Sequence, residues 1–463
     1  MKILLATPIN RSYVVMPSLG LGYLAARVSR QEFDVTILNC QKERMDFADF
    51  RDYIKLGRFD LIGFQMHSYD LNQVRRHLEI IKSTDPSVIT VVGGAHPSAA
   101  PLMTMEYLPS LDYAFRGEAD IGFPLFLNKL REDPFRPKNL AEVPGLVYRE
   151  KGKIRINQPG YIRHLDQLGF PAWDLLEPQN YPEASHGAFA KDFPTAPIII
   201  SRGCTFQCTF CAGKSITGPG VRFRSIDNVL EEMRYLNQEF GINEFLVEDE
   251  NLTFCRDITE EFCRKIIDSP MSGISWSCPS GIRIDTIDEE ILGLMEQSGC
   301  YSVALGIEFG TQKMLDQTKK QLTLSTIEEK VKLLRGTGIK TTGFFMLGVP
   351  GETVGDIKET IKLACRLKID RAQFNNFMPL PGSELGENLR AAGCLTDLDW
   401  GKLFVHNVSF ASGGIKPGRI KRLQRMAYLR FYLRPGIIFG LLREISSFRH
   451  LKFLCQRFLD AMS

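Results

Sequence analysis

The chain has 463 residues, which is longer than one hydrophobic core normally spans, so two or three domains are expected. With 44% hydrophobic and 24% charged residues, its composition is that of an ordinary soluble globular protein, and no repeat or low-complexity segment stands out. The formal net charge of +3 indicates no special partner, and the longest apolar runs, such as residues 437–442, are too short to cross a bilayer.

The amino terminus and the cysteines favour a cytoplasmic protein. The apolar run at residues 3–6 is too short for a secretory signal, and no cleavage site follows it. Most of the eleven cysteines are isolated, which suits a reducing compartment better than a disulfide framework.

Five short apolar runs near the start of the chain predict a parallel sheet. They lie at residues 2–7, 35–38, 61–66, 89–94 and 113–117, and helical patterns separate them. Residues 1–135 are therefore predicted to form a doubly wound, flavodoxin-like domain of the α/β class. Ligands of such sheets bind beyond the carboxyl ends of the strands, where the loops of this chain are rich in glycine, proline and polar residues.

Residues 136–195 break this rhythm. A hairpin is predicted at 145–157, turning at 151–153, and a proline-rich stretch follows it. We interpret residues 136–195 as a linker with some structure of its own.

A second series of alternating strands and helices occupies residues 196–393. Strands are predicted at 197–201, 244–248, 274–278, 302–307, 341–347 and 373–377. Six such units predict a partial (β/α)6, TIM-like barrel, with the chemistry at the carboxyl ends of its strands. After this barrel, residues 394–463 are predicted to form a basic, helical C-terminal region.

Three cysteines follow the first strand of this second series. Cys204, Cys208 and Cys211 form a CxxxCxxC pattern, whose tight loop can place three thiolates on one face of a [4Fe–4S] cluster. The fourth iron then keeps an open position for a chelating ligand. The alternatives are a zinc site, for which no fourth cysteine or histidine lies nearby, and three unrelated buried cysteines, which would not usually follow a strand at this spacing.

The segment that contains this motif, residues 197–392, resembles the radical S-adenosylmethionine (SAM) superfamily. GIEFGT at 306–311 is similar to the family's GIESGS, with Phe309 in place of the usual serine, and GFFMLGVPGE at 343–352 is similar to its GxIxGxPGE element. The resemblance implies that SAM chelates the open iron and that one electron from the cluster cleaves it to a 5′-deoxyadenosyl radical. It also implies SAM contacts at Phe210, Glu248, Asp249, Glu250, Arg283, Glu308, Thr311 and Gly348.

Each of these side chains has an expected role and a structural alternative. Phe210 would pack near the adenine, the acids at 248–250 would accept from the methionyl amine, and Glu308 would contact the polar end or the ribose of SAM. Arg283 would pair with the methionyl carboxylate. The alternatives are a solvated turn for the acids and a surface arginine at a helix start for Arg283.

A flavodoxin-like sheet ahead of such a barrel resembles the cobalamin-binding branch of the superfamily, which includes radical methyltransferases and the anaerobic magnesium-protoporphyrin monomethyl ester cyclase. The similar segments are PSLGLGYLA at 17–25, GGAHP at 93–97 and RGE at 116–118. They imply cobalamin contacts at Ser18, Leu19, Gly20, Gln65, Ser68, Gly93, Gly94, His96, Gly117 and Glu118.

The front domain also departs from other cobalamin proteins. The DxHxxG motif, which elsewhere supplies a histidine to cobalt, is absent from residues 8–22, as it commonly is in this branch. Gln65 and Ser68 stand where the branch often has serine and threonine, and His67 and His96 are more readily explained as ordinary hydrogen-bonding residues than as cobalt ligands. A domain with the fold but without the cofactor is the alternative.

If both cofactors bind, the expected function is cobalamin-dependent methyl transfer to an unactivated carbon of a small-molecule or lipid-like substrate, with an external one-electron donor such as flavodoxin or ferredoxin. Three alternatives remain: radical oxidation or ring formation without methyl transfer, a radical enzyme whose front domain only recognises the substrate, and a non-catalytic cluster protein for electron transfer or sensing. A cluster carrier would not need the SAM-binding elements.

The tail concentrates positive charge. From residue 419 onward there are ten lysines and arginines against two acids, and 419–434 is patterned as a basic amphipathic helix that ends before Pro435. We favour a helix that packs on the barrel over an interfacial segment that makes peripheral membrane contact. No nucleic acid is expected, because no binding module accompanies the charge. Near the end of the sixth predicted strand, Asn375, Asn376 and 379–382 are predicted to line the substrate cavity.

Overall fold

The computed structural model describes residues 1–462 except Arg11, 135–136, Ser185, 187–189, Ser272, Asp397, 412–413 and Ser446. The chain divides into two compact units. The first comprises Met1–Thr205 and Ala212–Glu244, and the second comprises Phe206–Cys211 and Phe245–Ser463. Among the described residues, none of the helices combines the length and the apolar character needed to span a membrane.

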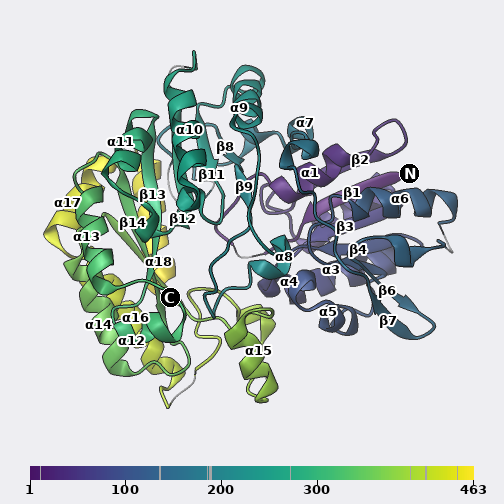
Figure 1. Ribbon diagram of the computed structural model, residues 1–463. Helices are drawn as coiled ribbons and strands as arrows, with labels where there is room; N and C mark the ends of the chain where they lie inside the picture. Colours follow the sequence, from purple (N-terminus) through teal and green to yellow (C-terminus); the bar gives the residue numbers. More distant parts are fainter. Residues whose placement is uncertain are drawn as a thin grey trace. The chain divides into compact units, whose positions relative to one another are not determined.

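The first unit contains a seven-stranded sheet in the order β2-β1-β3-β4-β5-β6-β7. Its first five strands are parallel, which confirms the predicted doubly wound sheet (Figure 1). The predicted hairpin is antiparallel and extends this sheet through the pairing of β5 with β6. The strands are β1 Lys2–Thr7, β2 Asp34–Asn39, β3 Leu61–Gln65, β4 Ile89–Gly93, β5 Tyr113–Phe115, β6 Leu146–Glu150 and β7 Lys153–Ile156.

Helices cover both faces of this sheet because the apolar side chains of its strands point to both sides. On one face, a buried core joins β1, β3 and β4 to α1 and α6. On the other face, Phe64 of β3 contacts Phe50 of α2 and His77 of α3. The helices are α1 Leu19–Arg27, α2 Phe47–Gly57, α3 Leu71–Thr84, α4 Ala95–Ala99, α5 Pro101–Tyr107 and α6 Gly122–Glu132.

The proline-rich connector packs as part of the first unit. Its Trp173 donates a 2.8 Å hydrogen bond to Glu232, and the same carboxylate pairs with Arg224. All three side chains are buried, so the ion pair of Arg224 and Glu232 is shielded from solvent. The elements here are α7 Trp173–Leu176, β8 Thr195–Ile198, β9 Ser201–Arg202, α8 Lys214–Thr217, β10 Arg222–Phe223 and α9 Ile226–Phe240.

The second unit contains five neighbouring strands in the order β15-β14-β13-β12-β11. Together with β8, they account for the six strands predicted for the barrel. Helices α11, α13 and α14 lie along one side of these strands (Figure 1). The strands are β11 Glu244–Val247, β12 Ser275–Ile282, β13 Cys300–Glu308, β14 Lys340–Leu347 and β15 Arg371–Asn376. The helices are α10 Arg256–Ile267, α11 Glu289–Gln297, α12 Gln312–Gln317, α13 Leu324–Leu334, α14 Val354–Arg366 and α15 Glu384–Ala391.

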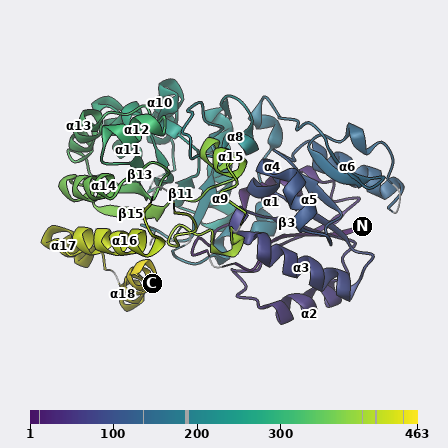
Figure 2. The same cartoon turned by 90° about the horizontal axis from the view of Figure 1, so that it is seen from below.

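The tail forms three helices, α16 Pro417–Tyr432, α17 Pro435–Glu444 and α18 Phe448–Met462. Helix α16 lies alongside β15 (Figure 2) and buries Ile420, Leu423, Ala427 and Phe431. The sequence-based prediction of a basic helix packed on the barrel is confirmed for this helix.

Candidate functional site

The cysteine loop begins at a glycine whose replacement would strain the backbone. Gly203 has a φ of +109°, and a Cβ at this position would lie 2.2 Å from the carbonyl oxygen of Gly220. Beyond it, Cys204 and Cys208 are half-buried, Cys211 is exposed, and all three thiols are free of disulfides. Three cysteines without disulfides on one short loop match in kind and number the protein ligands of a [4Fe–4S] cluster that keeps one open iron.

A charge network in the first unit holds the residues that precede the cysteine loop. Arg202 lies 2.8 Å from Asp120 and 3.4 Å from Glu118. Arg222, on the strand that pairs with β9, donates two hydrogen bonds to Glu118. Glu118 was predicted to contact cobalamin; in the structure its carboxylate is 6% exposed and is shared between the two arginines. It therefore ties the loop after β5 to the base of the cysteine loop.

The second half of the cysteine loop packs within the second unit. The backbone N–H of Thr209 donates to the carbonyl of Thr318 at 3.0 Å, and the carbonyl of Thr209 accepts from Leu385 at 2.9 Å. Phe210 makes an edge contact with the fully buried Phe309, with the ring centroids 6.4 Å apart. The phenylalanine that replaces the family's serine therefore serves as a packing partner for the predicted adenine-side residue.

The three acids after β11 differ in environment. Glu248 accepts a hydrogen bond from the hydroxyl of Ser280, Asp249 is buried and Glu250 is exposed. Asn251, the next residue, is 5% exposed and accepts from the backbone N–H of Arg283, while its Nδ2 has no hydrogen-bond partner in the described chain. Sequence reasoning did not single out Asn251. The only signal for it was its place in the polar run 248–251 after the strand.

Arg283 is committed to partners within the protein. Its guanidinium donates two hydrogen bonds to Asp285, one to the carbonyl of Lys320 and one to the carbonyl of Gln321, all between 2.8 and 3.1 Å. It also lies 3.7 Å from the ring centroid of Phe206. Because four of the five N–H donors of the guanidinium are used, little of it is left for a methionyl carboxylate.

Glu308 forms a buried ion pair that sequence reasoning missed. The residue has an unusual positive φ of 68°, and its Oε1 lies 3.0 Å from the Nζ of Lys320. The side chains of Glu308 and Lys320 are 12% and 8% exposed. Lys320 directly follows another lysine, Lys319, and nothing in the local sequence distinguishes the buried residue from the exposed one.

The elements after β13 and β14 are anchored to helix α14. The backbone N–H of Gly310 donates to the hydroxyl of Thr360 at 2.9 Å, and Thr311 donates to Asp356 at 3.3 Å. After β14, Gly348 has a φ of +84°, and its N–H donates to Glu352 at 2.5 Å. Burial raises the pKa of Glu352 to about 8 despite this hydrogen bond and a second one from Val349.

The predicted cobalamin residues gather at the carboxyl ends of β1, β3 and β4. Ser18 caps α1 by accepting from the N–H of Leu21, and its hydroxyl donates to Gln65. Gly94 has a φ of +104°, and a Cβ there would lie 2.8 Å from the carbonyl oxygen of Met66. A Cβ at Gly20 or Gly93 would make only ordinary contacts, at 3.6 Å or more, with the side chains of Gln65 and Phe115, so each position has room for a group of that size. These loops fit cobalamin at the switch point of the sheet.

His96 and His67 have different surroundings. The side chain of His96 is fully buried, with Nδ1 2.9 Å from the hydroxyl of Ser68, and burial lowers its pKa to about 4. The side chain of His67 is 47% exposed and lies 3.4 Å from Asp70. The structure thus gives His96 a hydrogen-bonding partner, Ser68, inside the domain.

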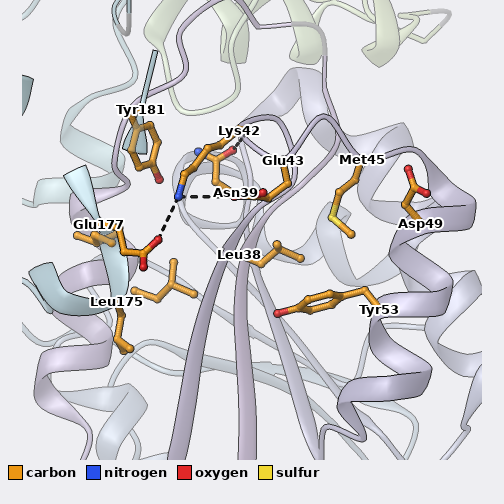
Figure 3. A pocket seen from close by; sticks show the side chains of 12 residues that line it. Leu38, Asn39, Lys42, Glu43, Met45, Asp49, Tyr53, Leu175, Glu177 and Tyr181 are labelled. Carbon is orange, nitrogen blue, oxygen red and sulfur yellow. Dashed lines mark hydrogen bonds and ion pairs between the residues drawn. The ribbon is translucent and has the colours of Figure 1, made fainter. Parts of the chain in front are cut away.

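A separate cavity of about 420 Å³ lies at the carboxyl end of β2, within the first unit (Figure 3). Lys42 crosses it, with Nζ 3.5 Å from both Glu43 and Glu177 and 5.0 Å from the ring centroid of Tyr181. Glu177 and Tyr181 belong to the proline-rich connector, so these contacts of Lys42 link the end of β2 to the connector. Sequence reasoning did not identify this cavity.

Two family models match separate parts of the chain. The model of the radical SAM superfamily matches residues 198–364, and that of the B12 binding domain matches residues 7–127. An uncharacterized methyltransferase of Pyrococcus horikoshii is 31% identical over 99% of this chain and 97% of its own length.

Other relatives and one solved structure extend this picture. Cytidylyl-2-hydroxyethylphosphonate methyltransferase of Streptomyces wedmorensis is 29% identical over 79% of this chain and 76% of its own length. The anaerobic magnesium-protoporphyrin IX monomethyl ester cyclase of Rubrivivax gelatinosus is 26% identical over 81% of this chain and 66% of its own length. The structure of TsrM from Kitasatospora setae with cobalamin and a [4Fe–4S] cluster has a TM-score of 0.68 at 18% identity, covering 91% of this chain and 81% of that one, which supports the same fold.

Proposed function

Because the chain belongs to the radical SAM superfamily and carries a B12-binding domain, we propose that it transfers a methyl group to an unactivated carbon. It is a radical SAM enzyme, and its cofactors are a [4Fe–4S] cluster, SAM and cobalamin. The observation that carries methyl transfer is the relative named as a methyltransferase, which matches nearly the whole chain.

Cys204, Cys208 and Cys211 would hold the cluster, and the loop around them would orient SAM. Phe210 offers an aromatic edge that is fixed by Phe309, and Glu248 and Asp249 offer carboxylates at the end of β11. Gly348 and its neighbours supply a backbone turn fixed by Glu352. These groups would position the sulfonium and exclude water from it.

In the first unit, the loops containing Ser18, Gly20, Gln65 and Gly94 would hold cobalamin through backbone contacts and the Ser18–Gln65 pair. When bound, the three cofactors supply a 5′-deoxyadenosyl radical that takes a hydrogen atom from the substrate carbon and a methyl group that replaces that hydrogen. The contribution of the protein is then to place the cofactors and the substrate.

The substrate would meet the inner face of the barrel. On β14 and β15 the fully buried residues alternate with less buried ones, and Phe344, Met346, Gln373 and Asn375 belong to the less buried set. Phe345 and Phe374 of the buried set stack on one another, and Phe374 also contacts α16. The less buried set therefore faces the interior. Asn375 keeps an Oδ1 without a hydrogen-bond partner in the described chain, so it would accept from a substrate donor.

A radical cyclisation or oxidation without methyl transfer is the second candidate. The observation that favours it is the similarity to the magnesium-protoporphyrin IX monomethyl ester cyclase over most of the chain. Both candidates need the same cluster, the same SAM and a one-electron donor, such as a flavodoxin or a ferredoxin. They differ in whether a methyl group reaches the product.

The test is anaerobic reconstitution of the full chain with iron and sulfide, with and without hydroxocobalamin. About four irons and about one cobalt per chain are expected after desalting. Replacing Cys204, Cys208 or Cys211 by alanine should abolish cluster binding, whereas the matched change at the exposed Cys394 should not. Iron retained by all three variants would overturn the assigned ligands, and iron without cobalt would remove the methyl-transfer proposal.

We also propose that α17 and α18 contact an anionic membrane surface. Phe439, Leu442, Phe448 and Leu459 are 56%, 58%, 82% and 60% exposed. Arg443, Arg449 and Lys452 are exposed beside them. Apolar side chains next to cations match the boundary of a bilayer that contains anionic lipids, and a lipid-like substrate would be reached there.

Co-sedimentation with vesicles of phosphatidylcholine and phosphatidylglycerol tests this surface. Binding of the reconstituted protein should fall with added salt and should fall at least tenfold in the Phe439→Glu, Phe448→Glu variant. The control is Leu56→Glu, because Leu56 is an 86% exposed side chain on α2 of the first unit. Absence of vesicle binding, with a dimer found instead by light scattering, would contradict the proposal.

A further inference from the structure

Lys320 is a buried cation on the edge of the cluster loop. The residue is 6% exposed, and its Nζ lies 3.0 Å from Glu308 and above Gly306. A Cβ at Gly306 would lie 2.8 Å from this Nζ, so the glycine leaves room for the ammonium group. A buried ammonium is expensive unless it is paired, which indicates a site built to hold it.

The backbone around Lys320 is held as firmly as its side chain. The residues on either side, Lys319 and Gln321, both have positive φ angles, of 54° and 56°. Arg283 fixes this turn by donating to the carbonyls of Lys320 and Gln321 at 2.8 and 3.1 Å. This arrangement explains why Arg283 is committed internally: it supports the turn that carries the cation.

The same turn contacts the cysteine loop within the second unit. The carbonyl of Thr318 accepts from the N–H of Thr209, the residue after Cys208. The turn that carries Lys320 is therefore bonded to the backbone of the residue that directly follows Cys208.

We propose that the Lys320–Glu308 pair sets the one-electron reduction potential of the cluster, with Lys320 raising it and Glu308 lowering it. A [4Fe–4S] cluster held by Cys208 would gain one negative charge on reduction from the 2+ to the 1+ state. A nearby cation stabilises that charge, and a nearby carboxylate opposes it. The inference rests on the proposed function in one respect, namely that Cys208 is a cluster ligand. Lys320 and Glu308 then act through their charges and do not bind the cluster. Arg283 acts indirectly, because it fixes the turn that carries Lys320.

The test is a redox titration of the anaerobically reconstituted full chain, without SAM, followed by the electron paramagnetic resonance signal of the reduced cluster. Lys320→Gln should lower the midpoint potential, Glu308→Gln should raise it, and Lys320→Arg should stay near the wild type. Lys319→Gln is the matched control, because the neighbouring lysine is 48% exposed and paired with Glu384, so solvent screens its charge. Iron and sulfide are measured in every variant.

Opposite shifts for the two glutamine variants would support the inference, since a general disturbance of the fold would move both potentials in one direction. A Lys320→Gln shift no larger than that of Lys319→Gln would overturn it. If Lys320→Gln loses its cluster, Glu308→Gln decides alone: an upward shift supports the inference, and an unchanged or lowered potential overturns it. Failure of the wild type to hold iron on the three cysteines would instead reject the proposed function.

Discussion

At the end of β14, the side chain of Glu352 combines two opposing influences. It is 2% exposed, and its Oε2 accepts from the N–H groups of Gly348 and Val349. These hydrogen bonds favour the charged form, but burial outweighs them and raises the pKa to about 8. The turn that the family resemblance assigns to SAM is thus closed by a carboxylic acid that stays protonated at neutral pH.

This protonation makes stability depend on pH in a defined direction. In the unfolded chain Glu352 ionises near its ordinary value of 4.5, whereas in the folded chain it keeps its proton up to about pH 8. Between these values the folded state binds more protons, so the free energy of unfolding attributable to Glu352 falls as pH rises, by at most about 1.4 kcal/mol per pH unit. Glu352→Gln keeps the acceptor but cannot ionise, and its unfolding free energy should lose this decline.

Thermal or urea unfolding of the wild type and Glu352→Gln between pH 5 and 8 measures the difference. The wild type should lose stability relative to the variant across this range. The control is Glu359→Gln on α14, an exposed glutamate that should leave the pH dependence unchanged. Parallel curves for the wild type and Glu352→Gln would show that Glu352 ionises normally in the folded state.

Single residues also show where sequence reasoning stops. Glu118 and Arg283 were expected to be ligand contacts because the segments that contain them resemble cofactor-binding segments of the family. The partner of Glu118 is Arg222, 104 positions away, and Arg283 bonds to carbonyls 37 and 38 positions away. Such distant pairings leave no mark on local sequence. The cysteine triplet was recognisable because all of its members lie in one loop.

At the level of elements, α16 protects the outer edge of β15. The backbone groups of Ala372 bond to the hydroxyl of Tyr432, which accepts at 3.2 Å and donates at 2.9 Å. Phe374 donates to the hydroxyl of Tyr428 and accepts from Gln424 at 2.7 Å. At Ala372 and Phe374, side chains of one helix therefore take the place of a further strand and block pairing of this edge with another chain.

Removing this cover should be costly. Tyr432→Phe would leave the buried N–H and carbonyl of Ala372 without partners, at about 1–3 kcal/mol of unfolding free energy. Urea unfolding followed by circular dichroism measures the loss, and Tyr235→Phe on the half-exposed face of α9 is the matched control, expected to change stability by less than about 0.5 kcal/mol. Equal stability of the two variants would show that water satisfies Ala372 and that α16 is not needed at this edge.

Element boundaries were less predictable than element order. The third barrel strand was expected to end at residue 278, but β12 continues to Ile282. Pro279 lacks the N–H that a strand interior uses, so the sequence pattern indicates an end there. In the structure the pairing of β12 with β13 shifts register between Cys278 and Ile282, and this irregularity accommodates the proline.

For the whole molecule, the sequence was sufficient for the fold class and the kinds of cofactor, because both depend on patterns within short segments. Alternating apolar runs predicted the two sheets, and motifs at successive strand ends predicted the cluster and SAM. The covered edge strand and the Lys320 site depend on contacts between segments far apart in the chain. Whether a charged side chain is buried and paired or exposed to solvent can be recognised only when the positions of those segments in the fold are known.

The distribution of predicted contacts leads to a last expectation, that the two metals bind independently. All the loops assigned to cobalamin lie in the first unit, whereas Cys208 and Cys211 lie in the second. The Cys208→Ala, Cys211→Ala variant should lose nearly all of its iron yet keep about one cobalt per chain. Gly94→Val should do the reverse, because its Cβ would press on the backbone of Met66 at 2.8 Å and its φ of +104° is strained for valine. Metal analysis after anaerobic reconstitution measures both, with the wild type and Gly152→Val as controls, since Gly152 has open space around it. Loss of cobalt together with iron in the cysteine variant would mean that cobalamin is held by groups outside the loops of the first unit.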